Sequence, residues 1–346
     1  MTRPRLAFNA LSLWPGGSGV QTYIVELLSA LVGVVDADLV AAVRPDAVDL
    51  LPPIVTPIVR NPGQGVRAIL TEARGLGPAA LVHGLDVHIP VRPRAPAVAT
   101  VHDLAVYDVP WAFTRSWVLR ERAAIAHAAR RADVVVAVSA FTAQRLRDRL
   151  GCDATVIPEA PSSDMVPATD AELAEVRVTY DLPDTFVLCV ATIEPRKDVA
   201  TLATACRDAG VALVIAGAAR AAAPAGAKLL GYVPRAHLPA LYGAATVVAY
   251  PSIYEGFGLP PVEAMACGAP VVAFRIPPLQ ESLGDAAVLT APGDAGELTD
   301  ALRGLVGDDE RRRELVAAGL ARARTMRWSD TAAATAAVYR RLGVAC

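Results

Sequence analysis

Residues 250–270 read YPSIYEGFGLPPVEAMACGAP, and this stretch predicts a strand, a helix and a second strand in that order. The apolar run Thr246–Tyr250 indicates a buried strand. Two consecutive prolines follow a glycine-rich loop, and prolines suit the first turn of a helix because the N–H groups that they lack have no helical partner there. Gly268 is typical of a helix end, and Ala269–Phe274 is the next apolar run. This alternation favours a parallel sheet with helices between its strands.

Two carboxylates frame the loop and the helix start. Glu255 falls on the loop at the carboxyl end of the first strand, and Glu263 falls in the first turn of the helix. Ligands of open α/β sheets bind at this end of the strands. Taken alone, either carboxylate could equally be a surface or capping residue, but the glycine- and proline-rich frame between them favours a binding site. The N–H groups that could face an anion or sugar hydroxyls there belong to Gly256, Phe257, Gly258 and Leu259.

Strands and helices alternate along both halves of the chain. A length of 346 residues suits two domains, since a domain averages about 150 residues. Residues 158–169, rich in proline and serine, are the expected linker, and a last helix is expected at about 329–342. The expected strands are 6–9, 37–43, 81–83, 98–102, 134–138, 155–158, 186–191, 211–216, 246–250, 270–274 and 287–290, with helices near 19–32, 114–130 and 140–150 in the first half.

Composition narrows the class of protein. The net charge is −2 without a concentrated basic patch, so nucleic acid is not an expected partner. No apolar stretch approaches the roughly 20 residues that cross a bilayer, and no signal-peptide core is recognisable near residue 1. The five cysteines lie far apart without a C-x-x-C pair, so buried free thiols are expected in place of a zinc site. We expect a soluble, cytoplasmic protein.

Arg196 and Lys197 follow the expected strand 186–191 and precede a helix. They could be an exposed helix start. They could equally bind a diphosphate, for which arginine offers a planar fork of donors and lysine a point charge.

The glycine loop at residues 16–19 invites a dinucleotide-binding interpretation. The fingerprint G-x-G-x-x-G would need glycine at position 22, which is Thr22, so a dehydrogenase is not indicated. Gly16 and Gly17 could instead let the backbone approach a phosphate or acceptor, or could form a structural turn. His102, at a strand end, could be a partnered buried histidine, and His83 is a poorer site candidate. Asp103 is a weak substitute for a metal-binding D-x-D pair.

Taken in order, these motifs resemble the retaining glycosyltransferases of family four, which have the GT-B fold and an E-x7-E motif. The match runs from about residue 6 to about residue 340. It departs from the family pattern at Glu159, where Asn is usual, at Gln280, and at Asp198, which replaces a frequent Asn. The segments that carry the resemblance are 250–270, 190–198, 231–234, 241–245, 284–287, 16–20, 100–103, 138–142 and 156–158.

The resemblance implies an α/β protein with two Rossmann-like parallel-sheet domains that face an interdomain cleft. Residues 1–160 would bind the acceptor and residues 161–326 the nucleotide sugar. Residues 327–346 would form a helix that packs back on the N-terminal domain.

The resemblance also implies roles for single residues. The catalytic group would comprise Glu255 near the transferred sugar, Arg196 and Lys197 on the donor diphosphate, and His102 at the hexose. Glu263 would accept hydrogen bonds from the ribose hydroxyls. No metal and no cofactor are expected, and the donor would be a UDP- or GDP-linked sugar. The remaining donor-binding candidates are Gly256, Phe257, Gly258, Leu259, Gly16, Gly17 and Glu281.

The implied reaction is retaining hexosyl transfer to an acceptor hydroxyl, on a glycan, a lipid-linked or a small-molecule acceptor, by front-face attack. A sugar-nucleotide-binding pseudoenzyme and a phosphorylase-like transfer are the alternatives. Trp111 and Trp117, with Phe113 and neighbouring arginines, could be core aromatics on a helix or a weak contact with the inner face of a membrane.

Overall fold

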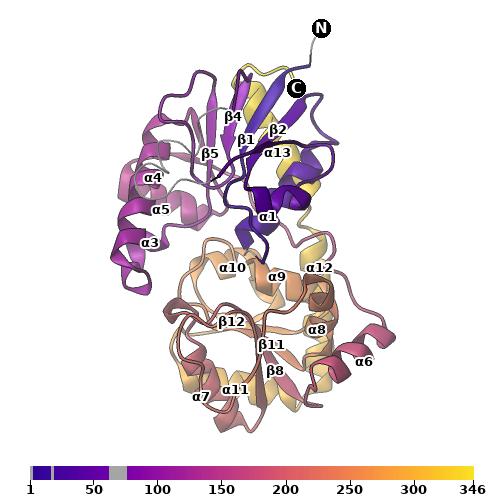
Figure 1. Cartoon of the computed structure of the whole chain (residues 1–346). Helices are drawn as coiled ribbons and strands as arrows, with labels where there is room; N and C mark the ends of the chain where they lie inside the picture. Colours follow the sequence, from indigo (N-terminus) through magenta and orange to yellow (C-terminus); the bar gives the residue numbers. More distant parts are fainter. Residues whose placement is uncertain (1–2, 17–18, 62–75) are drawn as a thin grey trace. The chain divides into compact units, whose positions relative to one another are not determined.

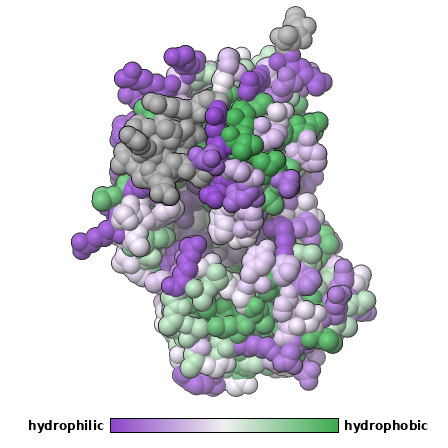
Figure 2. Space-filling model, viewed as in Figure 1, coloured by the Kyte–Doolittle hydropathy of each residue, from purple (hydrophilic) through white to green (hydrophobic). Residues whose placement is uncertain are grey.

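The computed structural model describes residues 3–16, 19–61 and 76–346. The chain divides into two compact units (Figure 1). Unit 1 consists of Met1–Glu159 and Arg327–Cys346, and unit 2 consists of Ala160–Met326. Hydrophobic residues on the face in Figure 2 lie in separate groups among hydrophilic ones over both units. Within the described ranges, no helix is both long and apolar enough to cross a membrane.

Unit 1 is built on a seven-stranded parallel sheet in the order β3-β2-β1-β4-β5-β6-β7. The central strands are runs of buried Val, Ala and Leu, as expected of a parallel sheet covered on both faces. The expected strands did not include β3, an edge strand that is short, largely exposed and interrupted by Pro57. The strands are β1 Arg5–Asn9, β2 Asp38–Val43, β3 Thr56–Val59, β4 Leu81–Gly84, β5 Ala97–Val101, β6 Val134–Ala137 and β7 Ala154–Val156.

The last helix of the chain belongs to unit 1. It packs against α1, and its Tyr339 is completely buried and hydrogen-bonded to His83 Nδ1 at 2.6 Å. His83 therefore serves the packing of this helix. The described helices of unit 1 are α1 Gly19–Leu31, α3 Ala105–Asp108, α4 Arg115–Arg131, α5 Ala140–Leu150 and α13 Trp328–Arg341, with 3-10 helices η1 Pro45–Leu50 and η2 Pro110–Ala112.

Unit 2 carries a six-stranded parallel sheet in the order β10-β9-β8-β11-β12-β13. The expected strands did not include β10, a half-exposed edge strand with an irregular register after an alanine-rich segment. The strands are β8 Phe186–Val190, β9 Ala212–Ala216, β10 Lys228–Gly231, β11 Val247–Tyr250, β12 Val271–Phe274 and β13 Val288–Thr290.

The helices of unit 2 connect these strands. One buried core joins α7 and α11 to one face of the sheet, with Leu202, Leu298 and Phe274 completely or nearly completely buried. The helices are α6 Asp170–Thr179, α7 Val199–Ala209, α8 Leu238–Ala244, α9 Leu259–Ala266, α10 Pro277–Leu283, α11 Ala295–Val306 and α12 Asp309–Arg324, with 3-10 helices η3 Pro195–Lys197, η4 Arg235–His237 and η5 Gly284–Ala286.

Each sheet has a point where its strand order reverses. In unit 2 the chain moves from β8 toward one edge and from β11 toward the other, so the loops after these two adjacent strands diverge. In unit 1 the same reversal lies between β1 and β4. Open α/β sheets bind ligands beyond the carboxyl ends of the strands at such a point. The two reversal points therefore locate the candidate site regions of each unit.

The cysteines are free, as expected. Four of them are buried, but Cys346 is partly exposed because it lies beyond the end of α13. The expectation of burial was wrong for this thiol.

Candidate active site

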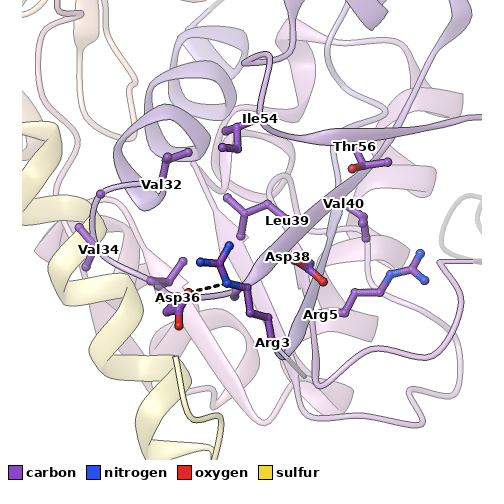
Figure 3. Close-up of a pocket in the computed structure, with 13 residues that line it drawn as sticks. Arg3, Arg5, Val32, Val34, Asp36, Asp38, Leu39, Val40, Ile54 and Thr56 are labelled. Atoms are coloured by element: carbon purple, nitrogen blue, oxygen red, sulfur yellow. Dashed lines mark ion pairs between the residues drawn. The ribbon is translucent and has the colours of Figure 1, made fainter. Parts of the chain in front are cut away.

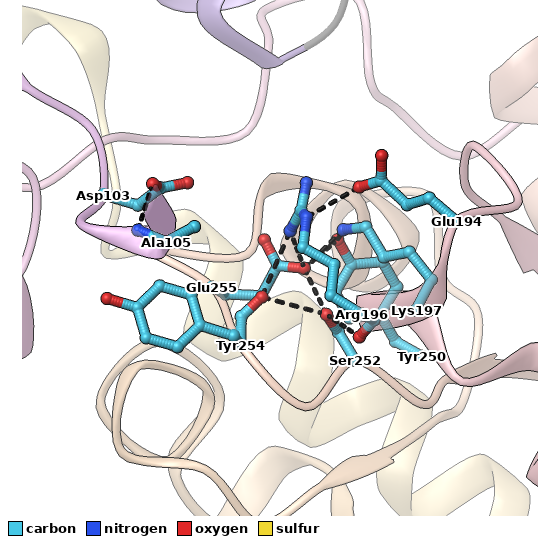
Figure 4. Close-up of polar contacts among 9 residues, drawn as sticks. All are labelled: Asp103, Ala105, Glu194, Arg196, Lys197, Tyr250, Ser252, Tyr254 and Glu255. Atoms are coloured by element: carbon cyan, nitrogen blue, oxygen red, sulfur yellow. Dashed lines mark hydrogen bonds and ion pairs between the residues drawn. The ribbon is translucent and has the colours of Figure 1, made fainter. Parts of the chain in front are cut away.

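The loops after β8 and β11 bring five polar side chains together in unit 2 (Figure 4). After β8 the chain turns through η3, and Asp198 then adopts a left-handed conformation with φ 37°. Its side chain accepts a hydrogen bond from Thr201 N at the start of α7. Both Asn and Asp tolerate this conformation and cap helices, so the departure from the family pattern at this position keeps the local structure.

Glu255 lies at the centre of the cluster. Its Oε1 accepts hydrogen bonds from Tyr250 OH at 3.0 Å, Ser252 Oγ at 2.5 Å and Arg196 Nη1 at 3.2 Å, and it pairs closely with Lys197 Nζ. The Lys197 ammonium also donates to Tyr250 OH at 2.6 Å. The sequence predicted Glu255, Arg196 and Lys197 as members of one site, and the structure brings them together.

The cluster is buried and charged. Lys197 and Glu255 are only 7 % and 8 % exposed, which excludes the alternative of an exposed lysine at a helix start. Burial by itself would raise the pKa of Glu255, but the charges of Lys197 and Arg196 lower it to about 2. Burial lowers the pKa of Lys197, and the attraction of Glu255 only partly offsets this effect. Arg196 Nε pairs with Glu194 at 2.6 Å, so the two cations face two carboxylates.

Glu263 lies on α9, and its place there corrects one expectation. Gly258 takes φ 94° and α9 begins at Leu259, with the two prolines in its first turn as expected. Glu263 consequently lies in the second turn instead of the first. It is buried, with Arg235 Nη2 at 3.8 Å, and Arg235 itself forms a two-pronged ion pair with Asp164.

The other donor-binding candidates in unit 2 differ in how far their side chains are exposed to solvent. Phe257 and Leu259 are buried, so their side chains belong to the core and only their backbone could meet a ligand. Glu281 is half-buried on α10, where its carbonyl oxygen accepts from Arg322 Nη2 at 2.7 Å. The roles assigned to all these residues stay predictions.

In unit 1, His102 follows β5 and has protein partners on both ring nitrogens. Nδ1 lies 3.0 Å from Glu159 Oε1, and Nε2 lies 2.9 Å from the carbonyl oxygen of Leu85. Burial lowers the pKa of His102, but the hydrogen bond and charge of Glu159, with a contribution from Asp86, raise it to about 9. The ring is thus protonated, and Glu159 and the Leu85 carbonyl oxygen fix its position. This favours the alternative of a partnered buried histidine.

The other described candidates of unit 1, Gly16 and Asp103, are found in local turns. Gly16 is exposed after β1 with φ 80°, whereas Gly17 lies outside the described residues. Asp103 accepts from Ala105 N at 2.8 Å and so closes a local turn. Among the residues that the structure describes, no group of three or more His, Cys, Asp and Glu side chains has the arrangement of a metal site.

Tyr250 and Ser252 of the cluster, and Glu194 beside it, were not predicted as site residues from the sequence. Tyr250 and Ser252 stand at the end of β11 and just beyond it, where the strand-end rule applies. A tyrosine in an apolar run, however, is indistinguishable from a core residue until its hydroxyl partners are known.

A pocket in the described part of unit 1 lies elsewhere, at the amino ends of β1, β2 and β3 (Figure 3). It measures about 720 Å³, and an Arg3–Asp36 ion pair crosses its rim. Because ligands of parallel sheets bind at the opposite, carboxyl edge of the strands, this pocket is not the candidate site.

Comparisons with known proteins agree with this geometry. The family described as "Glycosyl transferases group 1" matches residues 175–322, and the one described as "Glycosyltransferase Family 4" matches residues 17–160. The O-antigen chain mannosyltransferase B of Escherichia coli is 30 % identical over 284 residues, which cover 76 % of this chain and 74 % of that protein.

Solved structures share the fold. Sucrose-phosphate synthase from Thermosynechococcus elongatus matches with a TM-score of 0.80 at 21 % identity, over 99 % of this chain and 100 % of that chain. HepE of Anabaena, solved with UDP and glucose, matches with a TM-score of 0.77 at 19 % identity, over 98 % of this chain and 100 % of that chain. These likenesses confirm the GT-B fold prediction.

Proposed function

The chain belongs to the family 4 glycosyltransferases, and from this premise we propose that it moves a hexosyl group from a nucleoside-diphosphate sugar to an acceptor hydroxyl with retention of configuration. The observation that carries the proposal is the buried cluster of Arg196, Lys197 and Glu255 at the reversal point of the unit 2 sheet. Its two cations stand where an open α/β sheet binds its ligand.

Arg196 and Lys197 would bind the donor diphosphate. Negative charge grows on the departing phosphate as the glycosidic bond breaks, so cations fixed at this point stabilise the transition state more than the ground state. In the proposed reaction these two cations stabilise the charge of the departing phosphate without a metal ion. UDP- and GDP-linked sugars are the donors to test first, and mannose is the first sugar, since the E. coli relative is a mannosyltransferase.

Front-face attack fits the state of Glu255. A carboxylate whose pKa is held at about 2, with one oxygen bound by four donors, is a weak base and a weak nucleophile. It suits electrostatic support of an oxocarbenium-like sugar better than covalent attack. The bond from the anomeric carbon to the phosphate oxygen would break, and the bond to the acceptor oxygen would form on the same face. The acceptor proton would pass to the departing phosphate.

Glu263 would hold the ribose. A buried carboxylate accepts hydrogen bonds from two vicinal hydroxyls, and its charge strengthens both. The ion pair of Arg235 with Asp164 places a further cation 3.8 Å from Glu263.

A peripheral membrane contact is proposed for unit 1. Trp111 and Trp117 are 60 % and 42 % exposed, so the interpretation of these residues as core aromatics was wrong. Arg120 lies over the Trp117 ring at 4.6 Å, which joins a cation to an exposed aromatic. Co-sedimentation with vesicles of anionic lipid tests the contact, and a protein that stays in the supernatant at low salt would contradict it.

A thermal-shift panel of UDP, GDP, ADP and dTDP tests the proposed function. A ligand at about 100 times its dissociation constant raises the free energy of unfolding by about 2.7 kcal/mol. We expect UDP or GDP to raise the midpoint, and the matching sugar nucleotide to be transferred or slowly hydrolysed with retention, as read by NMR of the anomeric proton. Binding without transfer or hydrolysis would favour a sugar-nucleotide-binding pseudoenzyme, and no shift with any nucleotide would contradict the proposal.

A further inference from the structure

One carboxylate oxygen in the cluster, Glu255 Oε1, is approached by more hydrogen-bond donors than it has lone pairs. Glu255 Oε1 is approached by two cations, Arg196 and Lys197, and by two neutral hydroxyls, those of Tyr250 and Ser252. A carboxylate oxygen offers about two lone-pair sites. Four donors therefore compete for it, and the longest of the four contacts, at 3.2 Å, is that of Arg196.

The cations of this cluster are already neutralised. Arg196 is paired with Glu194 and Glu255, and Lys197 with Glu255. A diphosphate entering the cluster therefore does not meet bare positive charge. It must draw Arg196 and Lys197 toward itself, and Glu255 then loses its two strongest partners while it remains buried.

The hydroxyls of Tyr250 and Ser252 are placed to stay hydrogen-bonded to Glu255 when the cations move toward the diphosphate. Tyr250 is 2 % exposed and Ser252 is completely buried, and β11 and the turn after it fix both. The single proton of Ser252 has three acceptors within reach, of which Glu255 Oε1 at 2.5 Å is the nearest and the only charged one. Tyr250 OH accepts from Lys197 and donates to Glu255, which leaves the third N–H of the ammonium without a partner among the described residues.

We infer that Glu255 is the resident counter-ion of Arg196 and Lys197, that it yields them to the donor diphosphate, and that Tyr250 and Ser252 are positioning residues that hold its carboxylate during the exchange. This inference rests on the proposed function and deepens it. The third N–H of Lys197 makes the first contact with the phosphate, and the two hydroxyls keep the buried carboxylate hydrogen-bonded after the cations turn.

The first test removes the competing charge. In Glu255→Gln the cations lose their resident counter-ion, so isothermal calorimetry should show UDP or GDP, whichever the wild type binds, bound about tenfold more tightly while transfer falls. Weaker or unchanged binding in this variant would overturn the inference, because a carboxylate that yields its cations must compete with the diphosphate.

The second test removes the hydroxyls, with matched controls from the same unit. Tyr242 OH and Ser282 Oγ are buried and have no hydrogen-bond partner among the described residues, so Tyr242→Phe and Ser282→Ala delete equivalent atoms outside the cluster. Tyr250→Phe and Ser252→Ala should bind the nucleotide about 10- to 100-fold more weakly, and the controls should bind as the wild type does.

A pH series separates positioning from packing. Tyr250→Phe removes an acceptor from the charged form of Lys197, so its pKa falls further and the loss of binding at alkaline pH should begin at a lower pH than in Tyr242→Phe. If Tyr250→Phe does not fold, Ser252→Ala decides. Wild-type affinity in both cluster variants would overturn the inference alone, whereas a wild type that binds neither UDP nor GDP would overturn the proposed function with it.

Discussion

At the scale of single residues, charge is concentrated where water is nearly absent. Lys197 and Glu255 are almost fully buried, which is expensive for ions unless each is paired and hydrogen-bonded. Glu255 meets that requirement four times on one oxygen. Glu263 differs, because its described cation, Arg235, stands at 3.8 Å. The first carboxylate is thus tied to the cations of the cluster, and for the second we propose a neutral partner, the ribose of the donor.

Glu263→Ala should therefore weaken donor binding more than it slows the chemical step. If the carboxylate holds the ribose hydroxyls equally in the ground and transition states, its loss raises the donor KM and leaves kcat comparatively intact. Hydrogen bonds to a charged partner are worth about 1.5–3 kcal/mol, so the effect should be about 10- to 100-fold, and calorimetry with the bare nucleoside diphosphate should give the same loss.

Glu314→Ala is the control for this variant, since Glu314 is exposed on α12 and, among the described residues, forms an ion pair with Arg311 alone. It should bind and turn over as the wild type does. Wild-type nucleotide affinity in Glu263→Ala would make Glu263 a structural residue and remove the second half of the E-x7-E assignment.

At the scale of elements, the loop between β11 and α9 depends on one glycine. Gly258 has φ 94°, and a Cβ at this position would clash with Leu279 Cδ2 on α10. Both the backbone conformation and the space exclude a side chain. This glycine allows the chain to enter α9 abruptly, so that Glu255 stays on the loop while the prolines begin the helix.

Gly258→Ala should lower the free energy of unfolding by about 1–3 kcal/mol, through backbone strain and the displaced leucine. Gly304→Ala is the matched control, because Gly304 lies inside α11 and a Cβ added there would meet no atom within 4 Å. There alanine favours the helix by roughly 0.5–1 kcal/mol. Thermal unfolding followed by circular dichroism should move in opposite directions for the two variants, and a Gly258→Ala midpoint at or above that of Gly304→Ala would refute the argument.

At the scale of the whole molecule, contacts between residues far apart in the chain hold the segments of unit 1 together. His102 pairs with Glu159 across 57 residues, and Tyr339 on α13 pairs with His83 across 256. Thr331 Oγ1, also on α13, donates to the carbonyl oxygen of Pro158 at 2.8 Å, next to Glu159. A buried ion pair and a C-terminal helix are thus anchored at neighbouring residues of unit 1.

The His102–Glu159 pair should make the stability of unit 1 depend on pH. The pKa of His102 rises from 6.5 to about 9 on folding, so the stabilisation is complete below pH 6.5 and is lost as the pH rises through 9. Glu159→Gln should lower the free energy of unfolding by about 3–5 kcal/mol near pH 6 and reduce this dependence.

Tryptophan fluorescence is the suitable probe, because Trp14, Trp111, Trp117 and Trp328 all belong to unit 1. Urea unfolding between pH 6 and 10 gives the slope, with Glu314→Ala in unit 2 as the control. A wild-type slope that persists in Glu159→Gln would assign the pH dependence to other groups.

The sequence predicted the buried strands and most of the charged site residues for a physical reason. Strands such as Phe186–Val190 are buried on both faces, so they appear in the sequence as continuous apolar runs. The exposed edge strands β3 and β10 show no such run. Arg196, Lys197 and Glu255 lie in recognisable motifs after strands. The hydroxyl of Tyr250 and the pairing of His102 with Glu159 could not be predicted, because tertiary contacts alone create them.

The most direct test of the account compares the two lysines of the chain. Lys197 is buried in the cluster, whereas Lys228 is at the edge strand β10 and pairs with the exposed Asp181. The initial rate of sugar transfer, or of donor hydrolysis, is measured at saturating UDP- or GDP-linked sugar. Lys197→Ala should reduce kcat by about 100-fold or more, because it removes charge that stabilises the departing diphosphate, and Lys228→Ala should retain the wild-type rate. Equal rates in Lys197→Ala and the wild type would contradict the assignment of this cluster as the active site.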